Sequence, residues 1–300
     1  MKVFLTGGTG YIGSAILEVF MKNGEQVTVL TRSREKEKNL KQRGAEPHFG
    51  DLKNPEAFSQ VASEHDVIIH AGSETSPESS LIDKKAVETL LTSAKSAHHP
   101  LSFIYTSGVW VLGNTGDSLV DESAPVDHPA EIVKWRVEVE KRVLSENERH
   151  LTTAVIRPGI VYGGSGGICS GFFSSALKDG RAAYVGEGKN RWSLVHRDDL
   201  AKLYYLIAKS RSSGIFHGVD GTPTRVLDMA ESASLTAGKK GEVQSMPLDK
   251  AKQNMGLFAD ALALDQVVST KRASKIGWNP VHRSFTDSIT QLYQEYASVG

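Results

Sequence analysis

The first thirteen residues form the pattern that most constrains how this chain can fold. An apolar run over residues 1–6 predicts a buried strand, and it leads directly into a predicted helix through Gly7-Gly8-Thr9-Gly10-Tyr11-Ile12-Gly13. Gly7 lets the strand turn tightly, Gly10 lets the backbone approach a ligand, and Gly13 lets helix and strand pack closely. Because the helix N-terminus then faces a pyrophosphate, the pattern predicts a dinucleotide-binding turn for a nicotinamide cofactor. The alternative is an ordinary tight turn between a strand and a helix.

The end of the second predicted strand carries basic residues about twenty residues beyond the glycines. An acidic side chain there would accept hydrogen bonds from an unphosphorylated ribose, but the chain has Arg32 and Arg34, with Ser33 between them and Lys36 close behind. Charge-assisted hydrogen bonds to a 2′-phosphate contribute on the order of 1.5–3 kcal/mol each. We therefore expect NADP as the cofactor, bound by Arg32 and Arg34. The alternative is a solvated helix start, since residues 34–38 alternate in charge.

The later apolar runs alternate with amphipathic segments in the order of a doubly wound α/β fold. Further strands are predicted near residues 25–31, 47–52, 66–72, 101–106 and 153–157, and helices near 11–23, 34–43, 54–63, 78–97 and 130–148. Six parallel strands with right-handed crossovers would make a Rossmann-type sheet. We expect an NADP-binding domain over residues 1–157, to which residues 192–212 return, and a smaller α+β substrate-binding lobe over residues 158–300.

Composition narrows the classes of partner. The chain has 300 residues, with 35 basic and 35 acidic side chains, so its net charge gives no reason to expect nucleic acid or an anionic membrane. A small-molecule substrate is expected. The sequence shows no signal peptide and no apolar run that could span a bilayer, so a cytoplasmic location is expected. A single Cys169 excludes an intramolecular disulfide, and the ten histidines lack ligand spacing, so no metal is implied.

Seven motifs, in order along nearly the whole chain, resemble the extended branch of the short-chain dehydrogenase/reductase superfamily. That branch includes nucleotide-sugar epimerases and dihydroflavonol-reductase-like enzymes. The motifs are Thr6 to Gly13, Gly50-Asp51-Leu52, His70-Ala71-Gly72, Tyr105-Thr106-Ser107, Arg157-Pro158-Gly159-Ile160-Val161-Tyr162-Gly163, Val195 to Ala201, and Gly277-Trp278-Asn279-Pro280.

The resemblance implies further cofactor contacts and an assembly. Expected contacts are Asp51 and Leu52 with adenine, Ala71 and Gly72 beside the ribose, Pro158, Gly159, Ile160 and Val161 beside the nicotinamide, and also Thr9, Tyr11, Ile12 and Thr106. It makes residues 196–199 structural rather than catalytic. Many relatives dimerise through the helices equivalent to those near 78–97 and 130–148, so the resemblance raises a homodimer as an expectation.

The predicted active site departs from the superfamily pattern. Members normally carry Ser or Thr after the fifth strand and a Y-x-x-x-K pair on the next helix. Here Gly108 takes the hydroxyl position, with Ser107 one residue earlier. Aligning Glu140 with the common acidic residue puts Arg136 at the Lys position and Ile132 at the Tyr position. The chain therefore resembles an atypical, epimerase-like subgroup that lacks the pair.

Arg136 can take over part of the lost chemistry. A guanidinium can hold the nicotinamide ribose and supply a positive field, but it cannot release a proton. The alternative is a solvated arginine paired with Glu140 one helical turn away. Candidate proton donors are His128, expected near the helix start, Tyr162, which follows the strand beside the nicotinamide, and Ser107, which is better placed but a poorer acid. Each has a structural alternative, as a helix start, a packing residue or a backbone hydrogen-bond partner.

The sequence predicts an NADPH-dependent oxidoreductase that reduces a small, fairly apolar carbonyl or activated alkene, with Arg136 polarising the acceptor oxygen. Two other hypotheses stay open: a catalytically silent NADP(H)-binding sensor or scaffold, favoured by the missing Tyr, and an epimerase or dehydratase with tightly held cofactor. Residues 163–167 are predicted to be a loop, with a lid hinge as the alternative. Candidate pocket walls are Trp110, Trp135, Phe172, Phe173, Tyr184 and Trp192.

Overall fold

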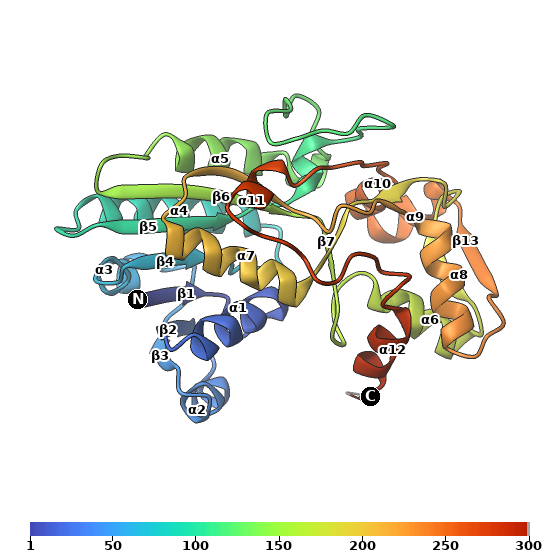
Figure 1. Cartoon of the computed structure of the whole chain (residues 1–300), viewed down its shortest axis with the longest axis horizontal. Coiled ribbons are helices and arrows are strands. Elements are labelled where there is room, and N and C mark those ends of the chain that lie inside the picture. Colours follow the sequence, from blue (N-terminus) through green and yellow to red (C-terminus); the bar gives the residue numbers. More distant parts are fainter. Residues whose placement is uncertain (299–300) are drawn as a thin grey trace.

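The computed structural model describes residues 1–298 and contains a parallel sheet beside a smaller C-terminal lobe (Figure 1). The sheet has seven strands in the order β11-β6-β5-β4-β1-β2-β3, and all six pairings are parallel. The strands are β1 (Lys2–Thr6), β2 (Gln26–Thr31), β3 (Glu46–Phe49), β4 (Val67–His70), β5 (Leu101–Thr106), β6 (Leu151–Pro158) and β11 (Gly214–Gly218). The predicted Rossmann-type α/β fold is confirmed.

The sheet has one strand more than the six that the sequence predicted. The extra strand, β11, pairs with β6 in a register that sets Ile215 opposite Val155. It is only five residues long and begins and ends with glycine, so its apolar run is too short to stand out as a strand. It lies just beyond the predicted returning segment, and α7 (Arg197–Ser210) leads the chain back to the sheet.

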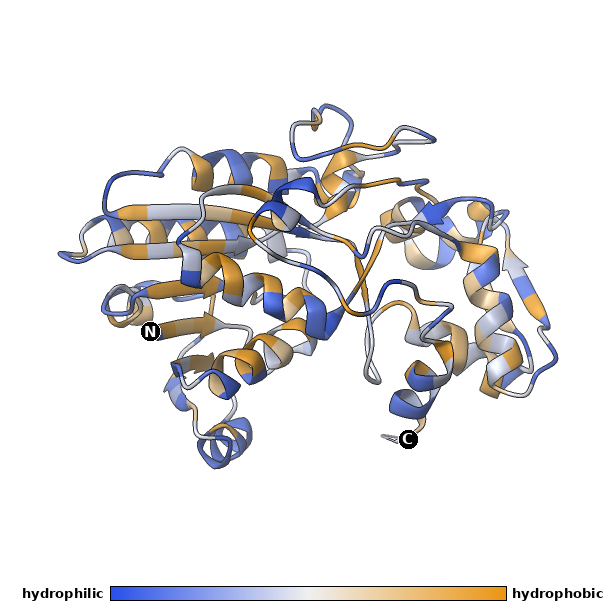
Figure 2. Ribbon diagram, in the orientation of Figure 1, coloured by the Kyte–Doolittle hydropathy of each residue, from blue (hydrophilic) through white to orange (hydrophobic). Residues whose placement is uncertain are grey.

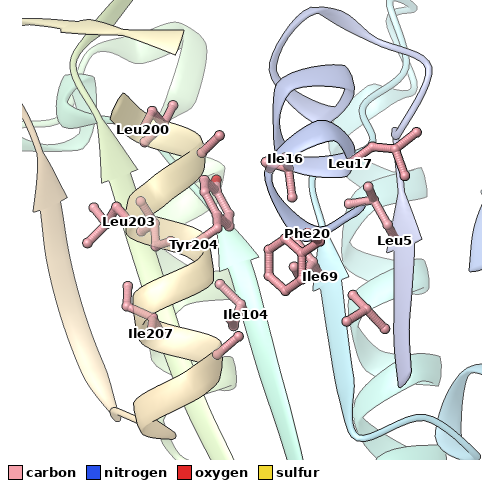
Figure 3. Close-up of a cluster of buried hydrophobic side chains, with 14 of the residues drawn as sticks. Leu5, Ile16, Leu17, Phe20, Ile69, Ile104, Leu200, Leu203, Tyr204 and Ile207 are labelled. Carbon is pink, nitrogen blue, oxygen red and sulfur yellow. The ribbon is translucent and has the colours of Figure 1, made fainter. Parts of the chain in front are cut away.

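Side-chain alternation along the central strands builds two cores, one on each face. Val3 and Leu5 of β1 face the helices α1 (Tyr11–Lys22) and α7, while Phe4 between them faces the opposite side. Figure 3 shows the first core, where Ile16, Leu17 and Phe20 of α1 and Leu200, Leu203, Tyr204 and Ile207 of α7 lie over Leu5, Ile69 and Ile104 of the sheet. The other face is covered by α3 (Glu56–Ser63), α4 (Ser79–Lys95) and α5 (Trp135–Leu144). Burial of each large apolar side chain contributes roughly 1.5–3 kcal/mol.

The helix predicted over residues 130–148 begins later than expected. Residues Glu131–Val133 form a short 3-10 turn, the second in the chain after the one at Val109–Leu112. The α-helix α5 starts only at Trp135. Ala130, which follows Pro129, is extended, with φ of -56° and ψ of 134°, so the chain enters the helix late. The segment before Trp135 therefore cannot continue the helical face of Arg136.

The C-terminal lobe has its own aromatic-rich core. Its elements are β7 (Ile160–Tyr162), α6 (Ser170–Asp179), β8 (Ala182–Val185), β9 (Arg191–Trp192), β10 (Leu194–His196), β12 (Thr224–Arg225), α8 (Val226–Thr236), β13 (Val243–Met246), α9 (Leu248–Met255), α10 (Leu257–Leu262) and α12 (Ile289–Ala297). Phe172, Phe173 and Phe285 pack together in its interior. In Figure 2 the strands of the large sheet are mainly orange, whereas α2 (Arg34–Gln42), at its lower edge, is mainly blue.

A returning C-terminal segment is tied to α7 through Asp199. The indole of Trp278 donates to the Asp199 carbonyl at 2.8 Å, and the Asp199 carboxylate accepts from the backbone N–H groups of Val281 and His282. Burial opposes ionisation of this carboxyl, but these hydrogen bonds and Lys202 hold its pKa below its ordinary value. The residues just before, including α11 (Lys271–Lys275), pack against the large sheet's first core through Ala273. No helix among residues 1–298 is long and apolar enough to cross a membrane.

Candidate active site

A cavity of about 410 Å³ lies at the carboxyl ends of β1, β2 and β4. In an open parallel sheet this edge is where ligands bind. Its lining residues are Gly7, Thr9, Gly10, Tyr11, Ile12, Gly13, Leu30, Thr31, Arg32, Ser33, Lys36, Gly50, Asp51, Leu52, Ala71, Gly72, Ser73 and Glu74. The glycine turn and the residues expected around adenine and its ribose are thus brought together.

The turn itself suits a pyrophosphate. Gly7 has a φ of +74°, and a Cβ there would lie 2.5 Å from the Ala71 carbonyl oxygen; a Cβ at Gly13 would lie 2.1 Å from the Gly7 oxygen. No side chain caps α1 at Gly10, and its first turn holds no acidic residue. The backbone N–H groups of that turn and the positive end of the helix dipole are therefore available to an anion. The residues present fit a dinucleotide.

Arg32 lies at the rim of this cavity in an ion pair that the sequence did not predict. Its Nη1 lies 2.7 Å from Oε1 of Glu74 and 3.8 Å from Oδ2 of Asp51. The Arg32 side chain is 61% exposed, whereas that of Glu74 is 13% exposed. Ser33 accepts from the Lys36 N–H as the N-cap of α2, which holds both residues in the lining. Glu74 could have been found from its place just after the carboxyl end of β4.

Two expected cofactor contacts do not line this cavity or the next. Arg34 pairs with Glu37 at 3.2 Å and lies over the Phe49 ring, 4.3 Å from its centre. The hydroxyl of Thr106 hydrogen-bonds the phenol of Tyr204 at 2.7 Å. In both cases the side chain is engaged by residues outside the linings of the two cavities.

A second cavity, of about 320 Å³, adjoins the first, because Tyr11 and Ile12 line both. Its other lining residues are Ser107, Gly108, Val109, Trp110, Val133, Arg136, Pro158, Gly159, Ile160, Val161, Gly167 and Ile168. The residues expected beside the nicotinamide therefore lie with Ser107 and Arg136. We call this space the reaction cavity.

Arg136 is fixed at the wall of the reaction cavity. Its Nη1 donates to the phenol oxygen of Tyr105 at 2.9 Å and to the Thr106 carbonyl at 2.8 Å, and the guanidinium lies 4.5 Å from the centre of the Trp135 ring. Within residues 1–298 no protein group accepts a hydrogen bond from its Nε or Nη2. Those donors can therefore face a ligand.

The alternative pairing of Arg136 with Glu140 is wrong. Glu140 instead accepts from Arg157, whose Nη2 lies 2.6 Å from Oε2, and both side chains are at most 3% exposed. A buried carboxylate requires a partner, and the arginine on β6 supplies it.

A chain of buried hydrogen bonds joins Arg136 to the nucleotide-binding turn. Tyr105 donates to Oδ2 of Asp83 at 2.8 Å, and Nε2 of His70 lies 3.3 Å from the other oxygen of that carboxylate. Nδ1 of His70 lies 2.8 Å from the Thr6 hydroxyl, which accepts from the backbone N–H of Gly72 at 3.1 Å. A continuous series of hydrogen bonds therefore runs from Arg136 in the lining of the second cavity to Gly72 in the lining of the first.

Asp83 is the buried carboxylate in this series of hydrogen bonds, and the sequence analysis missed it. Desolvation opposes its ionisation, but hydrogen bonds from His70 and Tyr105 and the charge of Arg136 outweigh it, so its pKa lies below the ordinary value. Burial raises the pKa of Tyr105 well above its usual range. The available signal was an acidic residue on the apolar face of α4, beside Ile82, Ala86 and Val87.

Ser107 presents a hydroxyl without a protein partner. Its Oγ is buried and makes no hydrogen bond within the described residues, while its backbone N–H donates to the Ile156 carbonyl at 2.8 Å. A buried polar atom left unpaired costs free energy that a ligand oxygen would recover. Ser107 is therefore suited to contact a ligand in the reaction cavity.

The other two candidate proton donors lie elsewhere. His128 is exposed, in the loop before the 3-10 turn, and does not line the cavity. Tyr162 is fully buried, with its phenol 3.4 Å from Oδ2 of Asp220, and burial and that carboxylate raise its pKa. The phenol in the lining belongs to Tyr11, which donates to the Gly163 carbonyl at 2.7 Å and whose pKa is also raised by burial.

The fold and cleft define a nucleotide-binding protein of the Rossmann class. Residues 3–217 match the model of the NAD dependent epimerase/dehydratase family, and the chain belongs to that family. A relative from Saccharomyces cerevisiae, the uncharacterized protein YLL056C, is 30% identical and is covered over 99% of its length by 98% of this chain.

Two further comparisons extend this finding. A ketoreductase of Stigmatella aurantiaca, named for 4-hydroxy-2-methyl-3-oxo-4-farnesyl-3,4-dihydroquinoline-1-oxide, is 27% identical over 84% of this chain and 78% of its own. The structure of human epimerase family protein SDR39U1 with NADPH superposes with a TM-score of 0.79 over 98% of this chain and 99% of that one. At 17% identity, this second likeness shows the fold alone.

Proposed function

We propose that this protein is an NADPH-dependent reductase of a small, fairly apolar carbonyl compound or activated alkene. The carrying observation is the reaction cavity, whose walls are mainly apolar and which places the unpaired Ser107 hydroxyl and the free donors of Arg136 beside the nucleotide-binding turn. Apolar walls favour an apolar substrate, and a few polar groups orient it. The ketoreductase relative from Stigmatella aurantiaca supports a carbonyl substrate.

We propose that the protein uses NADPH rather than NADH because of the rim of the 410 Å³ cavity at the glycine turn, which we call the nucleotide cavity. Arg32, Ser33 and Lys36 line the place where the second strand ends, and together they offer two cations and a hydroxyl to a 2′-phosphate. Arg32 must exchange its contact with Glu74 for one with the phosphate, so Glu74 opposes part of the gain. When bound, NADPH supplies the hydride.

The chain's own residues would act on the substrate oxygen. Arg136 and Ser107 donate hydrogen bonds to that oxygen as it becomes negative, and the loss of one such donor typically lowers the rate about a hundred- to a thousandfold. Tyr105 and the Thr106 carbonyl keep the guanidinium in place, so little reorganisation is needed. Because a guanidinium group is not a proton donor at neutral pH, we infer that the proton comes from solvent water that the Ser107 hydroxyl would hold.

A specific observation favours a second candidate, a catalytically silent NADP(H) sensor. Among the described residues, the lining of the reaction cavity includes no His, Asp, Glu or Cys, and its phenol, on Tyr11, is engaged with Gly163. General acid–base help is worth about a hundred- to ten-thousandfold in rate, so its absence could leave binding without turnover.

The test is NADPH oxidation by the purified protein with a panel of aldehydes, ketones, quinones and enones, with NADH in parallel and cofactor binding measured by titration. Turnover with NADPH well above that with NADH supports the reductase. Tight binding of added NADP(H) to protein that purifies without cofactor, with no turnover of any panel member, favours the sensor. Cofactor retained through purification, with no net oxidation, points to the epimerase or dehydratase hypothesis.

A further inference from the structure

A third cavity, of about 300 Å³, lies inside the C-terminal lobe. Its lining residues are Ile168, Gly171, Phe172, Ser175, Ala183, Tyr184, Val185, Trp192, Met246, Met255, Phe258 and Leu262. They come from α6, β8, β9, β13, α9 and α10 and from the loop before α6. We call this space the lobe cavity.

The lobe cavity adjoins the reaction cavity. Ile168 lines both, and Trp110 of the reaction cavity meets Phe258 of the lobe cavity edge to face, with ring centres 5.8 Å apart. Ile168 follows the glycine-rich loop, in which a Cβ at Gly167 would lie 2.9 Å from the Tyr11 ring. The side chains of Ile168, Trp110 and Phe258 therefore belong to the wall between the two spaces.

The two cavities differ in the chemistry they offer. Among residues 1–298, no charged side chain lines the lobe cavity. Its Ser175 hydroxyl donates to the Gly171 carbonyl at 2.7 Å and accepts from the Ala183 N–H at 2.9 Å, and the Trp192 indole donates to the Leu262 carbonyl at 3.0 Å. These two groups are already paired, and the Tyr184 phenol is the third polar side-chain group among the described lining residues. The cavity therefore offers an incoming group mainly apolar surface, part of it from the adaptable thioethers of Met246 and Met255.

We propose that the lobe cavity binds an apolar tail, an alkyl or isoprenoid chain, of the same molecule whose oxygen lies at Ser107 and Arg136. The assignment of the oxygen rests on the proposed function; the tail site rests on the lobe cavity itself. A molecule with one polar end and one apolar end matches the pairing of a cavity that holds the donors of Ser107 and Arg136 with a cavity lined mainly by apolar side chains. Each further methylene should tighten binding about two- to fourfold until the cavity is filled.

A blocking variant tests the site. Gly171 lies on α6 in the lining, and a Cβ there would meet no atom within 4 Å, so Gly171→Phe adds bulk at the cavity without a backbone clash. Ala183→Phe adds bulk from β8 and serves as the second variant if the first does not fold. Ser174→Phe is the matched control, because Ser174 is exposed on the same helix and does not line the cavity. Circular dichroism and NADPH titration report whether each variant is folded.

Binding is measured by calorimetry with 1-alkanols from butanol to decanol in the presence of NADPH, which cannot reduce them. Affinity should rise with each methylene in the wild type and in Ser174→Phe, and decanol affinity should fall at least about tenfold in the blocked variants. Equal decanol affinity in blocked and control variants, or no dependence on chain length, overturns the tail site. In parallel, 2-alkanones of the same lengths are tested as substrates with NADPH. Chain-length-dependent alkanol binding without ketone reduction upholds the tail site and counts against the proposed function.

Discussion

The nucleotide cavity and the reaction cavity share the lining residues Tyr11 and Ile12, but backbone dominates the walls of one and side chains those of the other. The first is shaped largely by backbone: glycines that no other residue can replace sterically, and an uncapped helix N-terminus. The second is lined by residues that meet from the segment after β5, from α5, from β6 and β7, and from the loop before α6. A short sequence motif can predict a site formed by backbone, whereas a site formed by side chains depends on segments that lie far apart in the sequence.

The two cavities also differ in how their cations are held. Arg32 lies at an exposed rim, where solvent and salt screen its interactions. Arg136 is anchored by Tyr105 and by the buried carboxylate of Asp83 behind it. Substitutions around the anchored arginine should therefore have larger effects than those around the exposed one.

Arg136→Met should show the largest effect. We expect kcat/KM for reduction of a panel ketone to fall about a hundred- to a thousandfold, because a preorganised donor to the developing oxyanion is lost. The affinity for NADPH should change far less, since Arg136 does not line the nucleotide cavity. Steady-state kinetics and cofactor titration measure the two quantities. Arg142→Met is the control, because Arg142 lies on the same helix as Arg136 and pairs with Glu88 of α4. An equally large loss of activity in the control, or no loss in Arg136→Met, contradicts the assignment.

Asp220→Asn should change how stability depends on pH. Burial raises the pKa of the Asp220 carboxyl, behind the reaction cavity against Tyr162, to about 7. The unfolded group titrates near 3.9, so the folded protein should lose stability as pH rises from about 4 to about 7, by roughly 2–4 kcal/mol. The asparagine variant should lack that decline.

Urea unfolding at a series of pH values measures this difference. Asp117→Asn removes a carboxylate that is 99% exposed and should leave the wild-type profile intact. Parallel profiles for Asp220→Asn and the wild type between pH 4 and 7 would show that Asp220 is ionised in the folded protein at neutral pH.

Arg32→Ala should weaken NADPH binding about ten- to a hundredfold, because a charge-assisted contact with the 2′-phosphate is removed. NADH binding should change by less than about threefold, since NADH lacks that phosphate. Titration with each cofactor gives both constants. Arg34→Ala is the matched control, as Arg34 lies outside the cavity lining. Equal losses for the two cofactors would place Arg32 away from the phosphate.

Glu74→Gln should have the smallest effect and the opposite sign. Removing this carboxylate frees Arg32 and lowers the negative charge near the phosphate, so NADPH affinity should rise about two- to fivefold, and less at high salt. Glu37→Gln, which alters an ion pair of α2 outside the cavity, should leave the affinity unchanged. Weaker NADPH binding in Glu74→Gln would indicate that Glu74 itself contacts the cofactor.

The sequence predicted most of the sheet correctly but not the positions of every candidate site residue. Strand alternation and helix periodicity predicted the sheet, but β11 was too short to be recognised. His128 was expected near the start of the helix that carries Arg136, yet the 3-10 turn at Glu131–Val133 separates it from α5, which starts only at Trp135. Tyr162 was expected just after the predicted strand over residues 153–157, but it lies in the separate strand β7, and its buried side chain pairs with Asp220 instead of reaching the cavity.

The sequence by itself determined the nucleotide-binding turn and the doubly wound sheet, because both depend on local spacing: glycines at fixed offsets and apolar residues at the periods of strand and helix. It also pointed to Arg136 and Ser107. Tertiary structure alone decided that Glu140 belongs to Arg157, that Asp83 and Tyr105 hold Arg136, and that Glu74 pairs with Arg32. The bonded partners lie between 17 and 42 residues apart in the sequence, so no local pattern encodes these contacts, since a buried charge selects its partner by position in the fold.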